Sequence, residues 1–288
     1  ALKSDYYFKI FFKIIVRLIT KNVGLKIKIK RKYCGIMVDP FLVVRDLTVE
    51  FVRGEPAIKR ISFEVEEASS FGILGKSGAG KSVLMNCIRG TKDHEPLTGN
   101  VIYNVAVCEN CNWIEYASKD GEKCDKCGAT LRYQQIDYWE ERKKLTPLSF
   151  SMYNRIAIMF QRTFGIFGEL PVITNIQKIL KSINYPDKLI NKRALQLLSE
   201  VKLSHRAMHL ARDLSGGEKQ RAVFAMCLAR NPLLFIADEP SGTLDPVTAV
   251  TVHEVMKSAV KEQGLTLLIT SHWPTAVAEL SDKAILLD

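Results

Sequence analysis

Eight consecutive residues have the composition and order of a loop that binds phosphate groups. They are Gly75, Lys76, Ser77, Gly78, Ala79, Gly80, Lys81 and Ser82, and they match the pattern G-x-x-x-x-G-K-[ST]. The glycines permit a tight loop whose backbone N–H groups surround a β-phosphate. Lys81 is then expected to reach the β- and γ-phosphates, and the Ser82 hydroxyl to bind Mg²⁺. An apolar segment precedes the loop and a helical one follows it, which favours this interpretation over a glycine-rich turn without a ligand.

Two carboxylates follow a second apolar segment, at residues 233–237. Asp238 stands where the carboxyl end of a buried strand is expected. Enzymes with a phosphate-binding loop of this kind hold their Mg²⁺ at that place. The adjacent Glu239 is placed to orient or deprotonate an attacking water. An apolar run followed by Asp-Glu is weak evidence alone, and it becomes strong evidence together with the phosphate-binding loop.

The elements that must position these groups alternate in type along the chain. Residues 42–51 and 58–65 alternate apolar and polar side chains, as half-buried antiparallel strands do. Residues 70–74, 233–237 and 265–269 are continuous apolar runs, typical of central parallel strands. Helical patterns cover residues 81–89, 175–214 and 247–263, and residues 284–287 read as a last strand. The fold class predicted is α/β, with a central, mostly parallel sheet, flanking helices and an antiparallel β subdomain.

Further segments, in a fixed order, resemble the motifs of one family. Ser215, Gly216, Gly217 and Glu218 are followed by Lys219, Gln220 and Arg221, and this run is similar to the signature motif of ATP-binding-cassette (ABC) ATPases. Ser215 and the two glycines would open a helix whose N-terminus can face a phosphate. In the family that phosphate belongs to the nucleotide of a partner cassette. The resemblance covers roughly residues 41–288 and implies an ATPase with a helical signature subdomain.

The resemblance also implies roles for residues outside the phosphate loop. Gln161 is expected to sense Mg²⁺ and the attacking water, and His272 to contact the γ-phosphate. A lone histidine is more often a core residue, but the accompanying motifs favour the functional role here. Phe51 takes the place of the aromatic that stacks on adenine, where the family usually has tyrosine. The expected catalytic residues are therefore Glu239, His272 and Gln161, and the expected Mg²⁺ ligands are Ser82, Gln161 and Asp238. The expected ATP-binding residues are Phe51, Gly75, Ser77, Gly78, Gly80, Lys81, Ser82, Ser215, Gly216, Gly217 and Asp245.

Two C-x-x-C pairs lie in residues 104–138, a segment unlike its flanks. Cys108 and Cys111 precede Cys124 and Cys127 by twelve intervening residues, the spacing of a four-cysteine zinc ribbon. A structural Zn²⁺ is the favoured interpretation, with a rubredoxin-like iron site, free thiols or disulfides as alternatives. The insertion is predicted to dock a protein partner, with the nearby aromatic residues Trp113, Tyr116, Tyr133 and Tyr138 as anchors if they are exposed; bracing of the antiparallel subdomain is the alternative.

The net charge is distributed very unevenly along the 288 residues. Residues 1–36 carry eight lysines and two arginines against one acid, so they account for +9 of the net +10. We interpret them as a basic N-terminal extension, upstream or non-native, with a peripheral membrane anchor or a signal-like segment as alternatives. Residues 37–288 are expected to form the ATPase domain, incomplete at its C-terminus. Their charge of +1 argues against a nucleic-acid partner, and no apolar run of 18 residues predicts an integral membrane span. The odd number of seven cysteines favours a reducing, cytoplasmic compartment.

The insertion and three other segments, residues 89–92, 161–165 and 271–274, indicate one particular family among the ABC ATPases. Together they are similar to the ATP-binding activation component (component A-two) family of the methyl-coenzyme M reductase system of methanogenic archaea. That resemblance implies a second ABC cassette as partner, in tandem in a longer chain or as a homodimer, and an activation complex for the nickel enzyme. The alternatives are the ATPase subunit of a membrane importer and a DNA-repair ATPase.

Overall fold

The computed structural model describes residues 39–52, 55–160 and 165–287, without the side chains of residues 51 and 52. Expectations for residues 1–36, for Gln161 and for the Phe51 side chain therefore lie outside the described residues.

A five-stranded parallel sheet forms the centre of the fold. Its strand order is β10-β3-β9-β8-β7, and every neighbouring pair is parallel: β10 (Lys283–Leu287), β3 (Ser70–Gly75), β9 (Thr266–Ser271), β8 (Leu234–Asp238) and β7 (Ile156–Met159). Every residue of β8 and β9 is buried, because other layers cover both faces of the sheet. This explains why these segments read as unbroken apolar runs.

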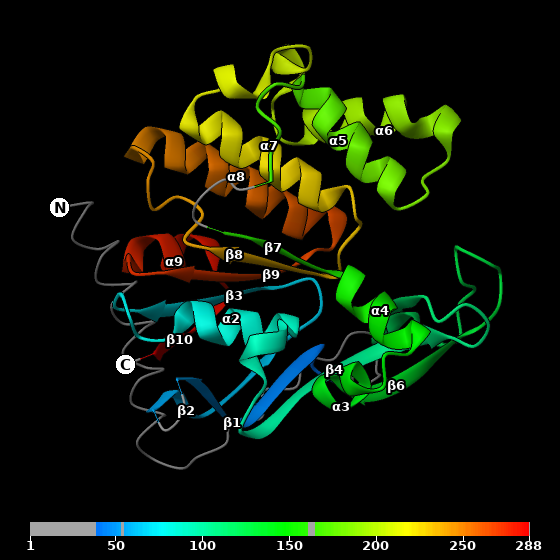
Figure 1. Ribbon diagram of the computed structural model, residues 1–288, viewed down its shortest axis with the longest axis vertical. Helices are drawn as coiled ribbons and strands as arrows, with labels where there is room; N and C mark the ends of the chain where they lie inside the picture. The colour runs from blue at the N-terminus through cyan, green and yellow to red at the C-terminus, as the bar shows by residue number, and fades with distance from the viewer. Residues whose placement is uncertain (1–38, 53–54, 161–164, 288) are drawn as a thin grey trace. The chain divides into compact units, whose positions relative to one another are not determined.

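Different elements cover the two faces of this sheet (Figure 1). Phe235 and Ala237 pack into one apolar cluster with the helices α5 (Val172–Ser182), α6 (Asp187–Glu200), α7 (Gly216–Leu228) and α8 (Pro246–Gln263). Leu234 and Ile236 belong to a second cluster, with α2 (Lys81–Arg89) and the antiparallel strands. Alternate residues of one strand therefore anchor the two layers, as the pleat of a β-strand requires. The short helix α9 (Pro274–Leu280) connects β9 to β10.

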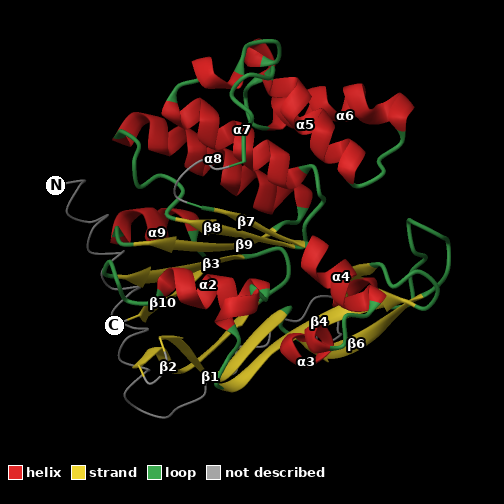
Figure 2. Cartoon of the chain, viewed as in Figure 1, coloured by secondary structure: helices red, strands yellow, loops and turns green. Residues whose placement is uncertain are grey.

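The second sheet is antiparallel and carries the cysteine insertion (Figure 2). β1 (Leu42–Val52) lies between β2 (Glu55–Val65) and β4 (Thr98–Cys108), and β4 also pairs with β5 (Ile114–Tyr116) and β6 (Leu131–Asp137). The helices α3 (Tyr138–Lys143) and α4 (Pro147–Asn154) then return the chain to β7. Strand β4 therefore runs continuously from the body of the fold into the insertion.

The predicted strands and helices are found, with two differences in residues 175–214. The helix is interrupted at residues 183–186, between α5 and α6, where Asn184 takes a φ of +56°. Regular helix ends at Glu200, Lys202 takes a φ of +58°, and only single 3₁₀ turns follow, at Ser204–Arg206 and Ala211–Asp213. Leu203, Ala207 and Ala211 recur every four residues and are all buried, which explains why this segment imitates a helix in the sequence. Part of it pairs instead with the start of α5, where Val172 N–H donates to the His209 carbonyl at 3.0 Å.

Candidate functional site

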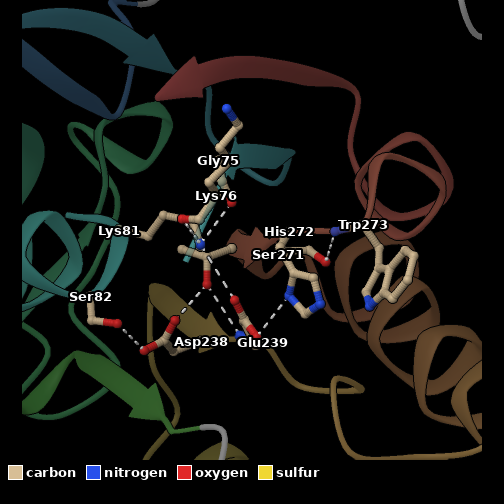
Figure 3. Close-up of polar contacts among 10 residues, drawn as sticks. Gly75, Lys76, Lys81, Ser82, Asp238, Glu239, Ser271, His272 and Trp273 are labelled. Carbon is tan, nitrogen blue, oxygen red and sulfur yellow. Dashed lines mark hydrogen bonds and ion pairs between the residues drawn. The ribbon is translucent and has the colours of Figure 1, made fainter. Parts of the chain in front are cut away.

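Three parallel strands end at one edge of the central sheet and bring the predicted chemical groups together. β3 ends at Gly75, β8 at Asp238 and β9 at Ser271, and the register places Asp238 opposite Thr270. The phosphate loop follows β3, Glu239 follows β8, and His272 follows β9. Figure 3 shows Lys81, Asp238, Glu239 and His272 converging at this edge. Ligand sites of open α/β sheets form at such carboxyl ends.

The loop of residues 75–82 has a backbone that only glycine accommodates at its end. Gly80 has a φ of +83°, and a Cβ there would lie 2.6 Å from the Ala57 carbonyl oxygen. Gly80 is also the N-cap of α2 and gives that helix no side-chain hydrogen bond. The N–H groups of the first turn are thus left for an anion, which the helix dipole attracts.

Lys81 is buried and is held by the loop itself. Its Nζ donates to the carbonyl oxygens of Gly75 at 2.8 Å and Lys76 at 2.9 Å, and lies 3.4 Å from Glu239 Oε1. These contacts fix a positive charge beside the carboxylate. A phosphate that enters the loop would exchange with them as a partner for the ammonium group.

Asp238 is bound by two hydroxyl groups, one on each oxygen. Ser82 Oγ donates to Oδ2 at 2.7 Å, and Thr270 Oγ1 donates to Oδ1 at 2.6 Å. Serine and aspartate oxygens are hard ligands of the kind Mg²⁺ prefers. Ser82 and Asp238 are thus already in contact where one ion could bind both. The sequence reasoning assigned no role to Thr270, whose only signal is its place at the end of an apolar run.

Glu239 contacts both of the charged groups expected to act with it. Its Oε2 lies 3.0 Å from His272 Nδ1, and its Oε1 faces Lys81. Its backbone has a φ of +47°, in the left-handed region that costs a non-glycine residue free energy, and its N–H donates to Thr270 O and Oγ1. The structure therefore holds the backbone of Glu239 in a strained conformation, as is common at functional sites.

An open cavity of about 550 Å³ lies over these residues. It is lined by Ala57, Ser77, Gly78, Gly80, Lys81, Ser82, Val83, Asp238, Glu239 and His272. Its size is within the usual range for small-molecule sites. Every one of these residues except Ala57 and Val83 was predicted from the sequence as a site residue.

The signature segment lies apart from this cavity, at the exposed start of α7. Ser215 caps the helix through a reciprocal pair with Glu218: Ser215 N–H donates to Glu218 Oε2 at 2.9 Å, and Glu218 N–H donates to Ser215 Oγ at 3.3 Å. Burial raises the pKa of Glu218, but the Ser215 N–H and Arg206 outweigh it and lower the pKa to about 2. Gly217 is required for packing, since a Cβ there would lie 2.0 Å from Thr248 Cγ2.

Of the other predicted site residues, Gly75 ends β3 and binds Lys81, whereas Ser215, Gly216 and Gly217 are not among the described residues that line the cavity. Asp245 is the N-cap of α8 and accepts hydrogen bonds from Val247 and Thr248 N–H at 3.0 Å.

The four paired cysteines meet in one cluster. Their Sγ atoms all lie within 4.8 Å of one another, with contacts of 3.4 Å (Cys108–Cys127), 3.5 Å (Cys127–Cys111) and 3.7 Å (Cys111–Cys124). A tetrahedron with Zn–S bonds of ~2.3 Å needs S–S distances of about 3.8 Å, so the four thiolates fit Zn²⁺. Iron has the same four-thiolate geometry and stays open as an alternative. Each pair turns through a positive φ, at Asn112 and at Gly128.

A buried arginine fastens the insertion to the parallel sheet. Arg155, which directly precedes β7, is 2% exposed and bonds Glu115 Oε2 of β5 at 2.9 Å. Its guanidinium also donates to the Asn231 carbonyl and lies 4.3 Å from the centre of the Trp113 ring. Lys126, from the second cysteine pair, lies 4.6 Å from the same ring. The cysteine cluster is thereby linked to the amino end of the sheet.

The aromatic residues near the cysteines do not form the exposed docking patch that the sequence suggested. Tyr138 is fully buried. The Tyr116 hydroxyl donates to the Leu233 carbonyl at 2.7 Å and accepts from Thr266 N–H at 2.9 Å, and Trp113 stacks with Arg155. Only Tyr133 is exposed, and its hydroxyl bonds Asp39. These contacts favour the bracing interpretation over the docking one.

Comparison with known sequences gives a consistent result. The family model described as ABC transporter matches residues 58–242. The chain is 47% identical over 247 residues to an ABC transporter ATP-binding protein of Methanocaldococcus jannaschii; the match covers 86% of this chain but only 45% of that protein. It is 31% identical over 255 residues to the phosphonates import ATP-binding protein of Nitratidesulfovibrio vulgaris, covering 88% of this chain and 85% of that one. The chain thus spans less than half of the first relative.

Solved structures share the fold. CbiO1 from Clostridium perfringens, part of the ABC transporter complex cbiONQ, superposes with a TM-score of 0.66 at 23% identity, covering 87% of this chain and 85% of that one. The MJ0796 cassette, solved as a dimer, gives a TM-score of 0.59 at 24% identity and covers 85% and 94%. Among the residues that the structure describes, no helix has the length and apolarity that crossing a membrane requires.

Proposed function

Since the chain belongs to the ABC transporter family of ATP-binding domains, we propose that it binds ATP with Mg²⁺ in the cavity beside Lys81 and hydrolyses the terminal phosphate bond. The observation that carries the proposal is the convergence of Lys81, Ser82, Asp238, Glu239 and His272 at three neighbouring strand ends around one cavity. These are the groups that phosphoryl transfer to water needs: a cation for the phosphates, hard oxygen ligands for Mg²⁺, and a base for the water.

In the proposed reaction, Lys81 exchanges its bonds to the Gly75 and Lys76 carbonyls for the β- and γ-phosphates. Ser82 and Asp238 would hold Mg²⁺, which neutralises charge on those phosphates. Glu239 accepts a hydrogen bond from the attacking water and takes its proton as the water oxygen bonds to the γ-phosphorus. The bond from the γ-phosphorus to the bridging β–γ oxygen breaks, and ADP leaves. His272 donates from Nδ1 to Glu239, because a carboxylate only accepts. A second hydrogen bond, from Nε2 to the γ-phosphate, then needs the doubly protonated imidazolium.

A second cassette completes the proposed site. The start of α7 at Ser215 is exposed and lies outside the cavity, which supports its use toward a nucleotide held by another copy or domain. The dimeric MJ0796 cassette supports a homodimer, and the Methanocaldococcus jannaschii relative, more than twice as long as the matched part, supports a tandem arrangement. Neither Gln161 nor the Phe51 side chain lies in the described part of the chain, and both keep their proposed roles toward Mg²⁺ and adenine.

We propose reductive activation of methyl-coenzyme M reductase as the process that the ATP cycle drives, in the cytoplasm. Its support is the resemblance carried by the four-cysteine insertion, with its proposed structural Zn²⁺, and by residues 89–92, 161–165 and 271–274. A specific observation favours a second candidate, the ATPase subunit of a membrane importer: the phosphonates import relative matches over 85% of its own length. The low charge of residues 37–288 disfavours a DNA-repair role.

Affinity purification of the full-length protein from its own cells, with and without detergent, separates the two candidates. Activation predicts recovery of the nickel enzyme from the detergent-free fraction and loss of ATP-dependent reactivation with Lys81→Ala. An importer subunit predicts recovery of a polytopic membrane protein that needs detergent. Recovery of the membrane protein alone would overturn the activation proposal and leave the ATPase proposal standing.

A further inference from the structure

A buried histidine contacts the loop that follows Glu239 and the helix that follows His272. His253, on α8, is 4% exposed. Its Nε2 lies 2.8 Å from Ser241 Oγ, and its Nδ1 lies 3.0 Å from Glu279 Oε2. Ser241 comes two residues after Glu239, in the loop between β8 and α8. Glu279 lies on α9, which begins two residues after His272.

The hydrogen-bond chemistry gives each partner of the imidazole a defined role. Burial raises the pKa of Glu279, but the hydrogen bond from His253 and the charge of Lys257 outweigh it and lower the pKa. The carboxylate is therefore ionised near neutral pH and can only accept, so Nδ1 carries a proton. In the neutral imidazole, Nε2 is then an acceptor, and the Ser241 hydroxyl must donate to it.

We propose that His253 is a positioning residue for ATP hydrolysis, which holds the loop after Glu239 against the helix after His272. This inference rests on the proposed function and deepens it. Glu239 has a strained backbone, with a φ of +47°, and such a conformation persists only where its surroundings enforce it. Gly242 N–H donates to the Glu239 carbonyl at 3.1 Å, so the loop at Ser241 forms part of that restraint.

A hydrogen-bonded chain of serine, imidazole and carboxylate also forms the catalytic triad of serine hydrolases. Two observations exclude a role of Ser241 as a nucleophile here. The imidazole is 4% exposed, which leaves no room for a substrate beside Nε2. Ser241 and His253 are also not among the described residues that line the cavity. The side chain therefore acts through the loop and not on a substrate.

The test compares His253→Leu, His253→Gln and Ser241→Ala in the full-length protein. Leucine fills the site without hydrogen bonds, whereas glutamine offers one acceptor and one donor in place of Nε2 and Nδ1–H. We expect His253→Leu to lower kcat for ATP hydrolysis at least ~10-fold, with KM for ATP within about twofold, because Lys81 and Ser82 are untouched. His253→Gln should recover most of kcat. Ser241→Ala, at a half-buried position where folding is not at risk, should lower kcat in the same direction.

Val255→Ala is the matched control, since Val255 is buried on the same helix and is not a hydrogen-bond partner of His253. It should lower the melting temperature and leave kcat unchanged. Adding Ser241→Ala to His253→Leu should lower kcat no further, because both remove one interaction. Wild-type kcat in His253→Leu, an equal loss in Val255→Ala, or fully additive losses would each overturn the proposal.

Nitrogen-15 NMR of the histidines separates this inference from the proposed function, since it needs no turnover. We expect His253 to carry its proton on Nδ1, and Ser241→Ala to shift its Nε2 resonance. A proton on Nε2 alone would overturn the positioning geometry even in an active enzyme. Failure of the ATPase proposal would show instead as a wild-type hydrolysis rate in Glu239→Gln.

Discussion

Replacing Glu239 with glutamine should separate ATP binding from ATP hydrolysis. The change keeps the size of the side chain and removes its negative charge and its basicity. Glu239 Oε1 lies 3.4 Å from Lys81 Nζ, so the carboxylate competes with ATP for the ammonium group. It also faces the position where the γ-phosphate is expected. Glu239→Gln should therefore slow turnover and strengthen binding together.

The structure sets the size of both effects. Coulomb's law gives about 1.2 kcal/mol for unit charges at this separation in water, and about 5 kcal/mol at an effective dielectric constant of 20. Lys81 is 6% exposed and Glu239 15%, so the figure in water is a lower bound, and it corresponds to ATP binding at least about eightfold tighter. Loss of the general base should slow hydrolysis by at least ~10²-fold.

Equilibrium titration with a fluorescent ATP analogue measures the first effect, and phosphate release at saturating ATP measures the second. Glu66→Gln is a matched control, since Glu66 pairs with Lys283 at 3.1 Å on the surface outside the cavity. It should change neither quantity. Hydrolysis by Glu239→Gln at the wild-type rate would refute the assigned role. Weaker ATP binding by that variant would refute the competition between Glu239 and the phosphates.

Four further changes test other parts of the structure. Thr270→Val removes the hydroxyl that donates to Asp238 and should lower ATPase activity about tenfold, while Thr270→Ser should retain the activity. Both effects are measured as ATPase activity against Mg²⁺ concentration. Cys124→Ser should lose the tightly held Zn²⁺ in metal analysis, about one ion per chain, while ATP still binds. Glu218 has a pKa lowered to about 2, so its carboxylate stabilises the fold above its ordinary value of 4.5, and that stability is lost as pH falls toward 2; Glu218→Gln should flatten the free energy of unfolding across this window. Glu115→Gln should destabilise the fold by about 3 kcal/mol in denaturant titration, because it leaves a charge buried without its partner, and adding Arg155→Met should restore part of the loss.

The groups around the cavity were predictable because each belongs to a short local pattern. The loop of residues 75–82 is contiguous, and Asp238 and Glu239 follow an apolar run whose end marks a strand terminus. The carboxyl ends of parallel strands meet at one edge, so local patterns were enough to predict that these residues converge. The same holds for the cysteine pairs, whose spacing alone indicates a metal site.

The supporting contacts were not predictable, because they join residues far apart in sequence with no pattern between them. Arg155 meets Glu115 across 40 positions, and His253 meets Glu279 across 26. In the sequence, nothing distinguishes Arg155 from a surface charge, or His253 from the other polar residues of its helix. Their roles depend on which helices and strands pack together, and that is decided by the whole core.

The positions of the two sites on the sheet constrain how the insertion can influence catalysis. The nucleotide cavity lies at the carboxyl ends of β3, β8 and β9, whereas Arg155 and Tyr116 fix the insertion to the amino ends of β7, β8 and β9. The cysteine cluster therefore supplies no group to the cavity. Strand β7, of four residues, runs from the amino edge of the sheet to its carboxyl edge, and Gln161 follows its end by two positions in the sequence. Any effect of the insertion on the cavity must therefore pass through the strands of the parallel sheet, because the insertion contacts their amino ends while the groups that line the cavity follow their carboxyl ends.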